Sequence, residues 1–349
     1  MVNQIDFVTF NCLSPNLSSP KEFINYLPSD LEASARLARI KKLIKGWIHE
    51  NLIILLQEIS LSWRGIFEKI FIENNYHFFC ANYGSNFSGN MGIAIAVPKQ
   101  LFLIEKIEYK RIGELITKVD YSSNTDELID SASNFFYKHG KKLPFFDNLF
   151  SDSEQDYSPT TITELAFQRQ NQAIYLRLKQ LQTQSENEEE IQPAKTFAVV
   201  NYHMPCCFRQ PDVQLLHSHY LLSYMSEFAN TAESVIIGGD FNIKPTSYIY
   251  DFITEKKVPI SLLEYLPHYF NTDERRYTSA YLTKNGEEAE FTNWSRTKWG
   301  GDFKDTLDYF FVSDKVKVRE AKMGLTSFGR CPNSDCPSDH LPLIISIEV

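Results

Sequence analysis

The stretch VIIGGDFNIKP, residues 235–245, carries an apolar run directly into an acid and an amide. Asp240 and Asn242 are two positions apart, so an extended backbone places both side chains on the same side. Gly238 and Gly239 allow a close approach of the backbone behind Asp240. Six further polar residues stand at or just beyond apolar, strand-like runs: Asn11, Glu58, His203, Asp308, Asp339 and His340.

Each of these polar residues, taken alone, is explained more simply as a turn former or a helix cap. Their repetition at successive strand ends instead predicts convergence on one edge of the sheets, because a buried charge is costly unless it is paired or bound to a metal. Carboxylate and amide oxygens suit a hard cation such as Mg²⁺ beside a substrate phosphate, whereas a zinc site would use more His or Cys. The two histidines suit proton handling or phosphate stabilisation.

Strands and helices must position these side chains. Apolar runs predict strands at 5–11, 51–58, 76–81 and 92–97, and helical spacing of apolar residues predicts helices over 32–50 and 63–74. The helix over 32–50 has a set of cations that the spacing puts on its solvent side: Arg36, Arg39, Lys41 and Lys42.

The second half of the chain continues this alternation. Residues 120–165 mix Ser, Asp and aromatics without a clean period and predict an insertion, part loop and part short helix. Strands are predicted at 172–181, 195–203, 233–238 and 341–349, and helices over 211–228 and 247–253. The segments 305–313 and 315–323 are predicted to form a strand pair. This irregular alternation favours two packed sheets with helices on the outside.

Composition limits the function classes. The 349 residues carry a formal net charge of −9, whereas a protein that neutralises nucleic acid over a broad surface is usually basic. Phosphates must then be attracted locally, through a few cations or a metal. The six scattered cysteines are expected to be free thiols. The N-terminus lacks a signal-peptide pattern and no apolar run reaches membrane-spanning length, so we expect an intracellular, cytoplasmic protein.

Six segments, in this order, resemble the endonuclease/exonuclease/phosphatase superfamily with its deoxyribonuclease I-like fold: TFNCLS, LLQE, VVNYHM, GGDFNIKP, TLDYFFVS and PSDHLPL. Longer stretches such as GGDFNIKPTSYIYDFI and CPNSDCPSDHLPL are similar to the deadenylase branch, which includes carbon-catabolite-repressor-type nucleases, nocturnin and the Angel proteins. The resemblance implies a four-layer α-β-β-α sandwich of two packed mixed β-sheets flanked by helices, forming one catalytic domain over 1–349. It also implies 3′-to-5′ removal of nucleotides from RNA.

The resemblance implies a metal site for Mg²⁺, with one or two ions and Mn²⁺ as a substitute. Glu58 matches the central metal-ligand glutamate, and Asn11 matches the asparagine near the metal. Asp339 matches a metal ligand or a neighbour of one. Asp240 matches the aspartate that orients or deprotonates the attacking water and contacts a second metal.

The remaining matches imply roles at the phosphate. His203 matches the histidine that donates to the scissile phosphate, and Asn242 the amide that holds the phosphate or the attacking water. His340 matches the histidine close to the phosphate, and Asp308 the acid that orients it, which is the physical logic of carboxylate-imposed tautomer choice.

Phe303 matches a phenylalanine that stacks on a base in the deadenylases. Two departures leave adenine preference open. Phe208 stands where that branch commonly has a proline, and Phe208 is itself able to stack on a base. Asp305 stands where a glycine is usual.

The same fold is compatible with other substrates and functions. The substrate is expected to be an RNA 3′ end, but the alternatives are 2′,5′-oligoadenylate, a dinucleotide phosphate, a phosphoinositide, a sphingolipid or damaged DNA. A further alternative is a binding module that keeps the fold but has lost catalytic activity. The matching residue types at all eight polar positions argue against it. No protein partner or oligomeric state is predicted.

Overall fold

The computed structural model describes residues 4–116, 162–181, 195–229, 234–257, 275–298, 301–327 and 329–349. The predicted insertion at 120–165 lies outside the described residues, apart from its last four positions. Within the described ranges, no helix is both long and apolar enough to cross a membrane.

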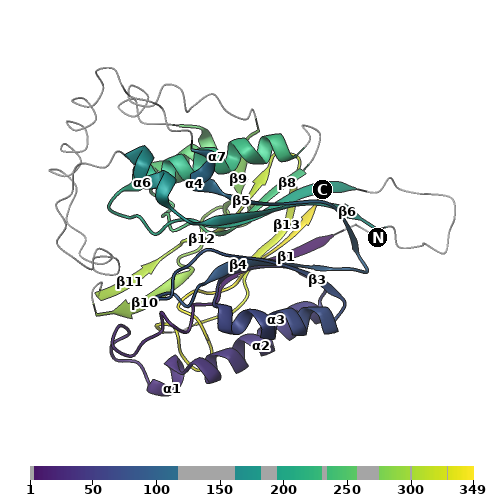
Figure 1. The fold of residues 1–349 in the computed structure, drawn as a ribbon. Coiled ribbons are helices and arrows are strands. Elements are labelled where there is room, and N and C mark those ends of the chain that lie inside the picture. The colour runs from purple at the N-terminus through teal and green to yellow at the C-terminus, as the bar shows by residue number, and fades with distance from the viewer. Residues whose placement is uncertain are drawn as a thin grey trace, which may run out of the picture.

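Two six-stranded sheets and one two-stranded sheet form the frame (Figure 1). The first sheet has the order β13-β14-β1-β2-β4-β3, and the second has the order β5-β6-β7-β8-β12-β9. Both are mixed, because β1 and β2 are parallel in the first and β7 and β8 are parallel in the second. The strands are β1 (Ile5–Asn11), β2 (Ile53–Ile59), β3 (Tyr76–Asn82), β4 (Gly92–Pro98), β5 (Phe102–Arg111), β6 (Gln172–Gln180), β7 (Thr196–His203), β8 (Ser234–Asp240), β9 (Tyr277–Ser279), β10 (Asn293–Thr297), β11 (Gly301–Asp305), β12 (Asp308–Ser313), β13 (Lys317–Met323) and β14 (Leu343–Glu348).

Several helices begin where the sequence supplies a start signal, among them α3, α7, α8 and α10. The Ser60 side chain accepts a hydrogen bond from the Trp63 amide at the start of α3, and Pro211 occupies the first turn of α7. The helices are α1 (Pro28–Leu31), α2 (Ala33–His49), α3 (Leu61–Glu73), α4 (Ile112–Leu115), α6 (Ile162–Gln168), α7 (Pro211–Phe228), α8 (Tyr248–Glu255) and α10 (Ala280–Asn285).

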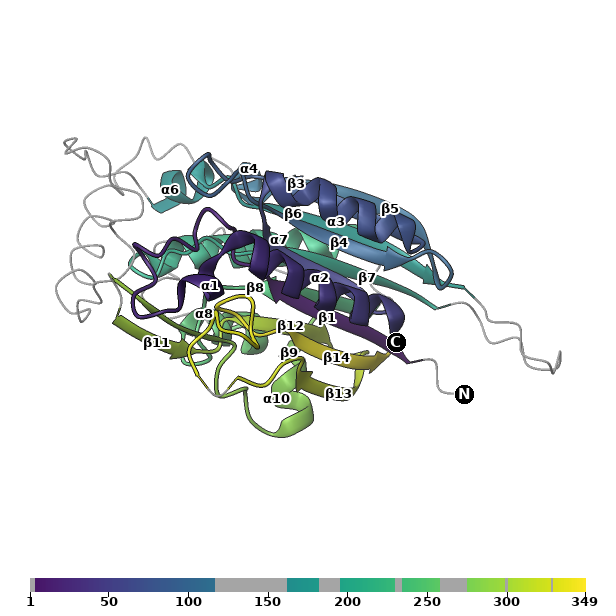
Figure 2. The same ribbon diagram turned by 90° about the horizontal axis from the view of Figure 1, so that it is seen from below.

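The packing confirms the predicted four layers. Helices α2 and α3 lie side by side over the outer face of the first sheet, and α7 covers the second (Figures 1 and 2). Between the sheets, the ring of Phe7 lies 6.1 Å from that of Phe197 and 6.0 Å from that of Phe310, in edge-on contacts. These rings belong to a continuous apolar core that joins the inner faces of both sheets.

The predicted pairing of 305–313 with 315–323 is wrong. Strand β12 pairs with β8 and β9 in the second sheet, whereas β13 pairs with β14 in the first. Both edges of β12 are therefore occupied. Val312 and Ala321 pack into the core between the sheets, so the turn between the two strands crosses from one sheet to the other.

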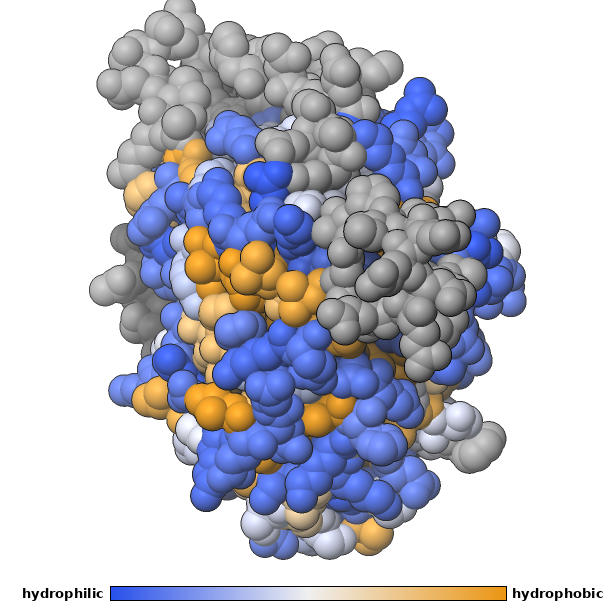
Figure 3. All heavy atoms as spheres, turned by 90° about the vertical axis from the view of Figure 1, so that its right-hand side faces the viewer, coloured by the Kyte–Doolittle hydropathy of each residue, from blue (hydrophilic) through white to orange (hydrophobic). Residues whose placement is uncertain are grey.

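Strand direction gathers the ends that carry the polar residues. The parallel strands β1 and β2 finish at one edge, and β14, antiparallel to β1, begins there. In the second sheet β7 and β8 finish together, and β12, antiparallel to β8, begins beside them. The start of β1 and the C-terminus lie at the opposite end of the sandwich (Figure 1). That opposite end has a mostly hydrophilic surface with smaller hydrophobic areas (Figure 3).

Helix α7 is held to α6 through a buried imidazole. Nε2 of His217 lies 2.9 Å from the Ala166 carbonyl oxygen, and Nδ1 lies 2.6 Å from the Tyr202 hydroxyl. Because the carbonyl can only accept, Nε2 carries the proton and Nδ1 accepts from the phenol. Burial lowers the pKa of His217 to about 4, so the ring is neutral in the folded protein.

This neutral His217 predicts a loss of stability on mild acidification. Between pH 6.5 and about 4 the unfolded chain binds a proton at this position that the folded chain does not, so the free energy of unfolding falls as pH falls. The fall is at most about 3 kcal/mol, from ~1.4 kcal/mol per pKa unit. Urea unfolding of the parent and of His217→Gln over this range measures it. The variant should show the shallower slope and the exposed control His49→Gln the parental one; equal slopes in all three would contradict the prediction.

Candidate active site

The predicted polar residues lie together where the two sheets end. In the second sheet, Asp240 is in register with Asp308 on one side and His203 on the other. In the first, Asn11 ends β1 and Glu58 stands near the end of β2. Asp240, Asp308 and Asn11 are each 1% exposed, whereas Glu58 and Asp339 are partly exposed and lie at the solvent side of the group.

Asn11 joins the acids of the two sheets. Its Nδ2 lies 3.1 Å from Oε1 of Glu58 and 3.0 Å from Oδ2 of Asp240. The other oxygen of Glu58 accepts from the Ser14 amide at 3.0 Å. The Asn11 Oδ1 accepts from the Leu13 amide at 2.9 Å and so faces away from the carboxylates. Asn11 thus holds the two acids as a donor in this geometry.

The backbone at Glu58 is unusual and is supported from the opposite sheet. Glu58 has φ of +55°, and the register between β2 and β4 shifts between Leu56 and Ile59. The Asn201 Nδ2 of β7 donates to the carbonyls of Leu56 at 2.9 Å and Ala94 at 2.8 Å. The Asn201 Oδ1 accepts from Gln57 at 2.8 Å. This amide pair satisfies groups that the irregular ladder leaves open and fixes the bulge that presents Glu58.

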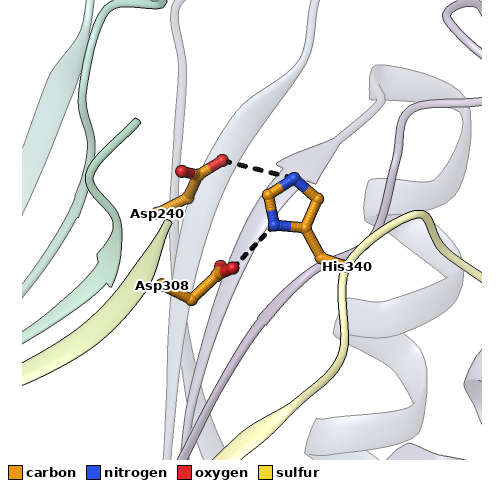
Figure 4. Close-up of side chains that lie close together, drawn as sticks. All are labelled: Asp240, Asp308 and His340. Atoms are coloured by element: carbon orange, nitrogen blue, oxygen red, sulfur yellow. Dashed lines mark hydrogen bonds and ion pairs between the residues drawn. The ribbon is translucent and has the colours of Figure 1, made fainter. Parts of the chain in front are cut away.

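His340 lies between two acids (Figure 4). Its Nδ1 lies 2.7 Å from Oδ2 of Asp308, and its Nε2 lies 3.7 Å from Oδ2 of Asp240. The hydroxyl of Thr292 also donates to Oδ2 of Asp308, at 2.6 Å. Asp308 therefore holds the Nδ1 side of the ring and leaves Nε2 facing Asp240.

His203 approaches the same oxygen of Asp240 from the other side. Its Nε2 lies 3.5 Å from Oδ2 of Asp240, and its Nδ1 lies 2.5 Å from the hydroxyl of Tyr83. The Asn171 side chain donates to the His203 carbonyl oxygen at 2.8 Å and holds the backbone. Two imidazoles thus flank one carboxylate oxygen.

The turn after β8 places Asn242 beneath this group. Its amide N–H donates to Oδ1 of Asp240 at 2.9 Å, and its Nδ2 donates to the Met204 carbonyl at 3.0 Å. Gly239 has φ of +145°, and a Cβ there would meet the Tyr202 carbonyl oxygen at 1.8 Å. Only glycine fits, because β7 passes directly behind the turn.

Asp339 enters from the loop before β14. Its Oδ2 accepts from Asn293 Nδ2 at 3.2 Å, and its carbonyl accepts from the Trp294 amide at 3.1 Å. Strand β10 therefore anchors the loop that carries both Asp339 and His340.

Burial governs the electrostatics. Burial raises the pKa of Asp240. The neighbouring His340 lowers this pKa, and the Asp308 carboxylate raises it further. Burial also raises the pKa of Asp339, with His340 opposing and Glu58 adding to the rise. Burial alone would lower the pKa of His340, but Asp308, Asp240 and Asp339 together raise it well above its ordinary value. The site therefore concentrates negative charge that favours a cation.

The donor set fits a hard divalent cation. In the described part of the chain, ligand atoms of Asp240, Asp308 and His340 lie within 4.8 Å of one another. Oδ1 of Asp308 is buried without a hydrogen-bond partner among the described residues. This cluster shares only Asp240 with the predicted ligands Glu58, Asn11, Asp339 and Asp240. The Asn11 amide lies between Glu58 and Asp240. The carboxylate oxygens around it still suit Mg²⁺ better than zinc.

The expectation that Arg36 faces solvent is wrong. Arg36 is 0% exposed and donates to four groups in the loops beside the site. The acceptors are the Pro337 carbonyl at 2.6 Å, the Ser18 hydroxyl at 2.9 Å and the carbonyls of Cys12 at 2.6 Å and Leu13 at 2.5 Å. Burial lowers the pKa of Arg36 to about 10. The guanidinium ties the loop after β1 to the loop that leads to His340.

The two predicted base-stacking rings contact each other. The ring centroids of Phe208 and Phe303 are 6.3 Å apart, and both residues are half-buried. Nζ of Lys244 lies 5.2 Å from the centroid of Phe303 and 2.6 Å from a carboxylate oxygen of Asp305. The two positions that depart from the deadenylase pattern therefore both shape the surroundings of Phe303. The ring of Phe208 contacts Phe303, and Asp305 pairs with the Lys244 ammonium that lies over its ring.

Sequence reasoning missed several supporting residues: Tyr83, Gln57, Asn201, Thr292 and Arg36. Gln57 and Asn201 carried a signal, since each is a polar residue in an otherwise apolar run one or two positions before a predicted site residue. Tyr83 carried none, because it lies outside the matching stretches and its partner is 120 residues away. Thr292 lies within the stretch FTNWSRTKWGGDFKDTLDYFF, which is similar to the deadenylase branch, but nothing local pairs it with Asp308, 16 residues away.

Comparison with known proteins places this geometry in context. A family model described as "Endonuclease/Exonuclease/phosphatase family" matches residues 8–340. The chain is 28% identical over 158 residues to a probable CCR4-Not complex 3′-5′-exoribonuclease subunit Ccr4 of Vairimorpha ceranae, covering 43% of this chain and 32% of that protein. It is 23% identical over 261 residues to a protein of the same description in Enterocytozoon bieneusi, covering 68% and 49%. The chain thus spans less than half the length of these relatives.

Solved structures share the fold at low identity. The human Nocturnin catalytic domain with bound sulfate has a TM-score of 0.61 and 18% identity, covering 100% of this chain and 95% of that one. ANGEL2, a 2′,3′-cyclic phosphatase, in complex with adenosine-2′,3′-vanadate has a TM-score of 0.65 and 18% identity, covering 99% and 96%.

Proposed function

The chain belongs to the endonuclease/exonuclease/phosphatase family of hydrolases that act on phosphate esters, and from this premise we propose that it is a Mg²⁺-dependent 3′-to-5′ exoribonuclease. It releases nucleoside monophosphates from an RNA 3′ end. The single catalytic domain over 1–349, with its insertion at 120–165, and a cytoplasmic location are part of this proposal.

One observation carries the proposal. Glu58, Asn11 and Asp240 are joined by hydrogen bonds across the two sheets, and both histidines direct Nε2 at Asp240. Acids that bind a cation and imidazoles that donate to a phosphate thus meet at one point, as hydrolysis of a phosphodiester requires. The curated relatives described as 3′-5′-exoribonuclease subunits favour RNA among phosphate esters.

Glu58, Asp240 and Asp339 are the residues that would hold Mg²⁺. When bound, the ion offsets the charge of the phosphate and of the leaving oxygen. Asp308 has a buried oxygen without a partner, but its other oxygen is committed to His340 and Thr292. We therefore propose that Asp308 orients His340 through Oδ2, while its Oδ1, unpartnered among the described residues, leaves it available to the cation as well.

The chain's own groups supply the rest of the reaction. Asp240 positions the attacking water and accepts its proton. The Nε2–H groups of His203 and His340 donate to the phosphoryl oxygens, where negative charge grows in the transition state. Asn242, bonded to Asp240 through its backbone, holds the phosphate or the water beside it.

The substrate's bases are proposed to stack at Phe303 and Phe208. One side of Phe303 is covered by Lys244, which Asp305 holds in place. Base–aromatic stacking is worth about 1–3 kcal/mol per base and tolerates many sequences. Since Phe208 and Asp305 both change the surroundings of Phe303, we propose tolerance of several bases in place of a strict preference for adenine.

Incubation with 5′-labelled RNA tests the function. Oligo(A) and mixed-sequence RNA should each shorten stepwise from the 3′ end in Mg²⁺ and stay intact in EDTA. Phe303→Ala should raise KM for both by about 5- to 150-fold, the range that corresponds to about 1–3 kcal/mol. Intact RNA in Mg²⁺ would contradict the exoribonuclease proposal.

Rival substrates form the other arms of the same assay: 2′,5′-oligoadenylate, a dinucleotide phosphate, a phosphoinositide, sphingomyelin, abasic DNA and RNA ending in a 2′,3′-cyclic phosphate. The last is included because ANGEL2, which shares the fold, is a 2′,3′-cyclic phosphatase. If one of these compounds is hydrolysed and linear RNA is not, that compound represents the substrate class. If none of the compounds and no RNA is hydrolysed, the alternative of a binding module without activity is favoured.

A further inference from the structure

Tyr83 joins the first sheet to His203 of the second. It lies just beyond β3, where its amide and that of Gly84 both donate to the Met91 carbonyl, at 2.9 and 2.8 Å. Its hydroxyl lies 2.5 Å from Nδ1 of His203, and the two rings meet edge-on with centroids 6.1 Å apart. A fixed loop therefore delivers this phenol to the imidazole.

The surroundings of His203 decide which atom carries the proton. Nε2 faces Oδ2 of Asp240 at 3.5 Å, and a carboxylate oxygen can only accept. Nε2 is then a donor, and the Tyr83 hydroxyl, which can both donate and accept, is placed to donate to Nδ1. The opposite arrangement would set the Nε2 lone pair against the carboxylate. Burial, with Glu58 and Asp240 nearby, raises the pKa of Tyr83 well above its ordinary value, so the phenol keeps its proton to donate.

The two histidines consequently differ in their partners. Nδ1 of His340 meets the carboxylate of Asp308, whereas Nδ1 of His203 meets a neutral phenol. A carboxylate partner favours a doubly protonated ring. A phenol that donates to Nδ1 selects the singly protonated ring with Nε2–H. His203 and His340 thus direct two Nε2 atoms, each with a different partner at Nδ1, toward the same oxygen of Asp240.

We propose that Tyr83 is a positioning residue that fixes His203 as the Nε2–H tautomer and directs this N–H at the phosphoryl oxygen of the substrate. The catalytic part of this inference rests on the proposed function, whereas the tautomer does not. A substrate phosphate at Asp240 would then receive its hydrogen bond from Nε2 without first reorienting the ring.

Tyr83→Phe removes one oxygen and keeps the ring. We expect kcat on 5′-labelled oligo(A) to fall by about 10- to 100-fold with KM within about twofold, the loss typical when the partner of a functional side chain is removed. The melting temperature should stay near that of the parent. Tyr76→Phe is the matched control, since Tyr76 begins the same strand and its hydroxyl donates to the Ile48 carbonyl at 3.4 Å, away from the site. It should leave kcat unchanged.

A spectrum separates this proposal from the identity of the substrate. Long-range ¹H–¹⁵N spectra of histidine-labelled protein, assigned with His203→Gln, report which ring nitrogen carries the proton. The parent should show His203 protonated at Nε2 alone, and Tyr83→Phe should show a mixture of tautomers. A parent protonated at Nδ1, or a Tyr83→Phe spectrum and kcat equal to those of the parent, would overturn the proposal. If oligo(A) is inert, the proposed function fails and the spectrum alone decides the tautomer.

Discussion

Asp240→Asn should abolish turnover, with kcat reduced by about 10³-fold or more, while the far-UV circular dichroism stays native. The variant removes the acceptor for the water proton, a contribution typically worth about 10²–10⁴-fold. It also removes the carboxylate that both imidazoles and Asn11 face. Single-turnover measurement with saturating labelled RNA checks the chemical step directly.

The same substitution should not weaken the fold. Burial raises the pKa of Asp240, which means that the charged form is disfavoured in the folded protein. Removing this charge should leave the melting temperature in EDTA equal to that of the parent or higher. Asp314→Asn is the matched control, because Asp314 is exposed in the turn after β12. Parental activity in Asp240→Asn would exclude the mechanism, and a collapsed fold would exclude the stability argument.

Arg36→Met should lower the free energy of unfolding by about 3–5 kcal/mol. The methionine keeps much of the side-chain volume, so the loss reports the polar contacts. Three carbonyl oxygens would lose their donor: those of Cys12, Leu13 and Pro337. A buried acceptor left without a partner costs about 1–3 kcal/mol. Urea denaturation at pH 7 measures the change.

Two further variants make the Arg36 result specific. Arg36→Lys keeps the charge but replaces the planar fork by one ammonium, so it should fall between the parent and Arg36→Met. Lys42→Met removes an exposed cation from the same helix and should change stability by less than about 0.5 kcal/mol. A loss below about 1 kcal/mol in Arg36→Met would show that solvent replaces the guanidinium without cost.

Local sequence was sufficient for the central strands and the long helices, and it singled out the polar residues of the candidate site. It did not predict β5, β9, β10 or β11. Strand β2 follows from an unbroken apolar run and α2 from apolar helical spacing, both of which depend on neighbouring residues. The comparisons confirm the resemblance to the family and to its deadenylase branch. The acid and amide of GGDFN are recognisable without any partner, because a carboxylate that ends a buried strand is costly unless it is paired or bound to a metal.

Tertiary structure alone decided how those residues are held. Arg36 has helical spacing that suits an exposed cation, yet carbonyls from two loops surround it, one of them 301 residues away. The strands on either side of Asp314 look like a hairpin but enter different sheets, because β8 and β9 already occupy both edges of β12. Tyr83 meets His203 across 120 residues. Amino-acid type and local spacing thus set which groups are available, whereas the partner of a buried polar group depends on chain segments that meet only once both sheets have packed.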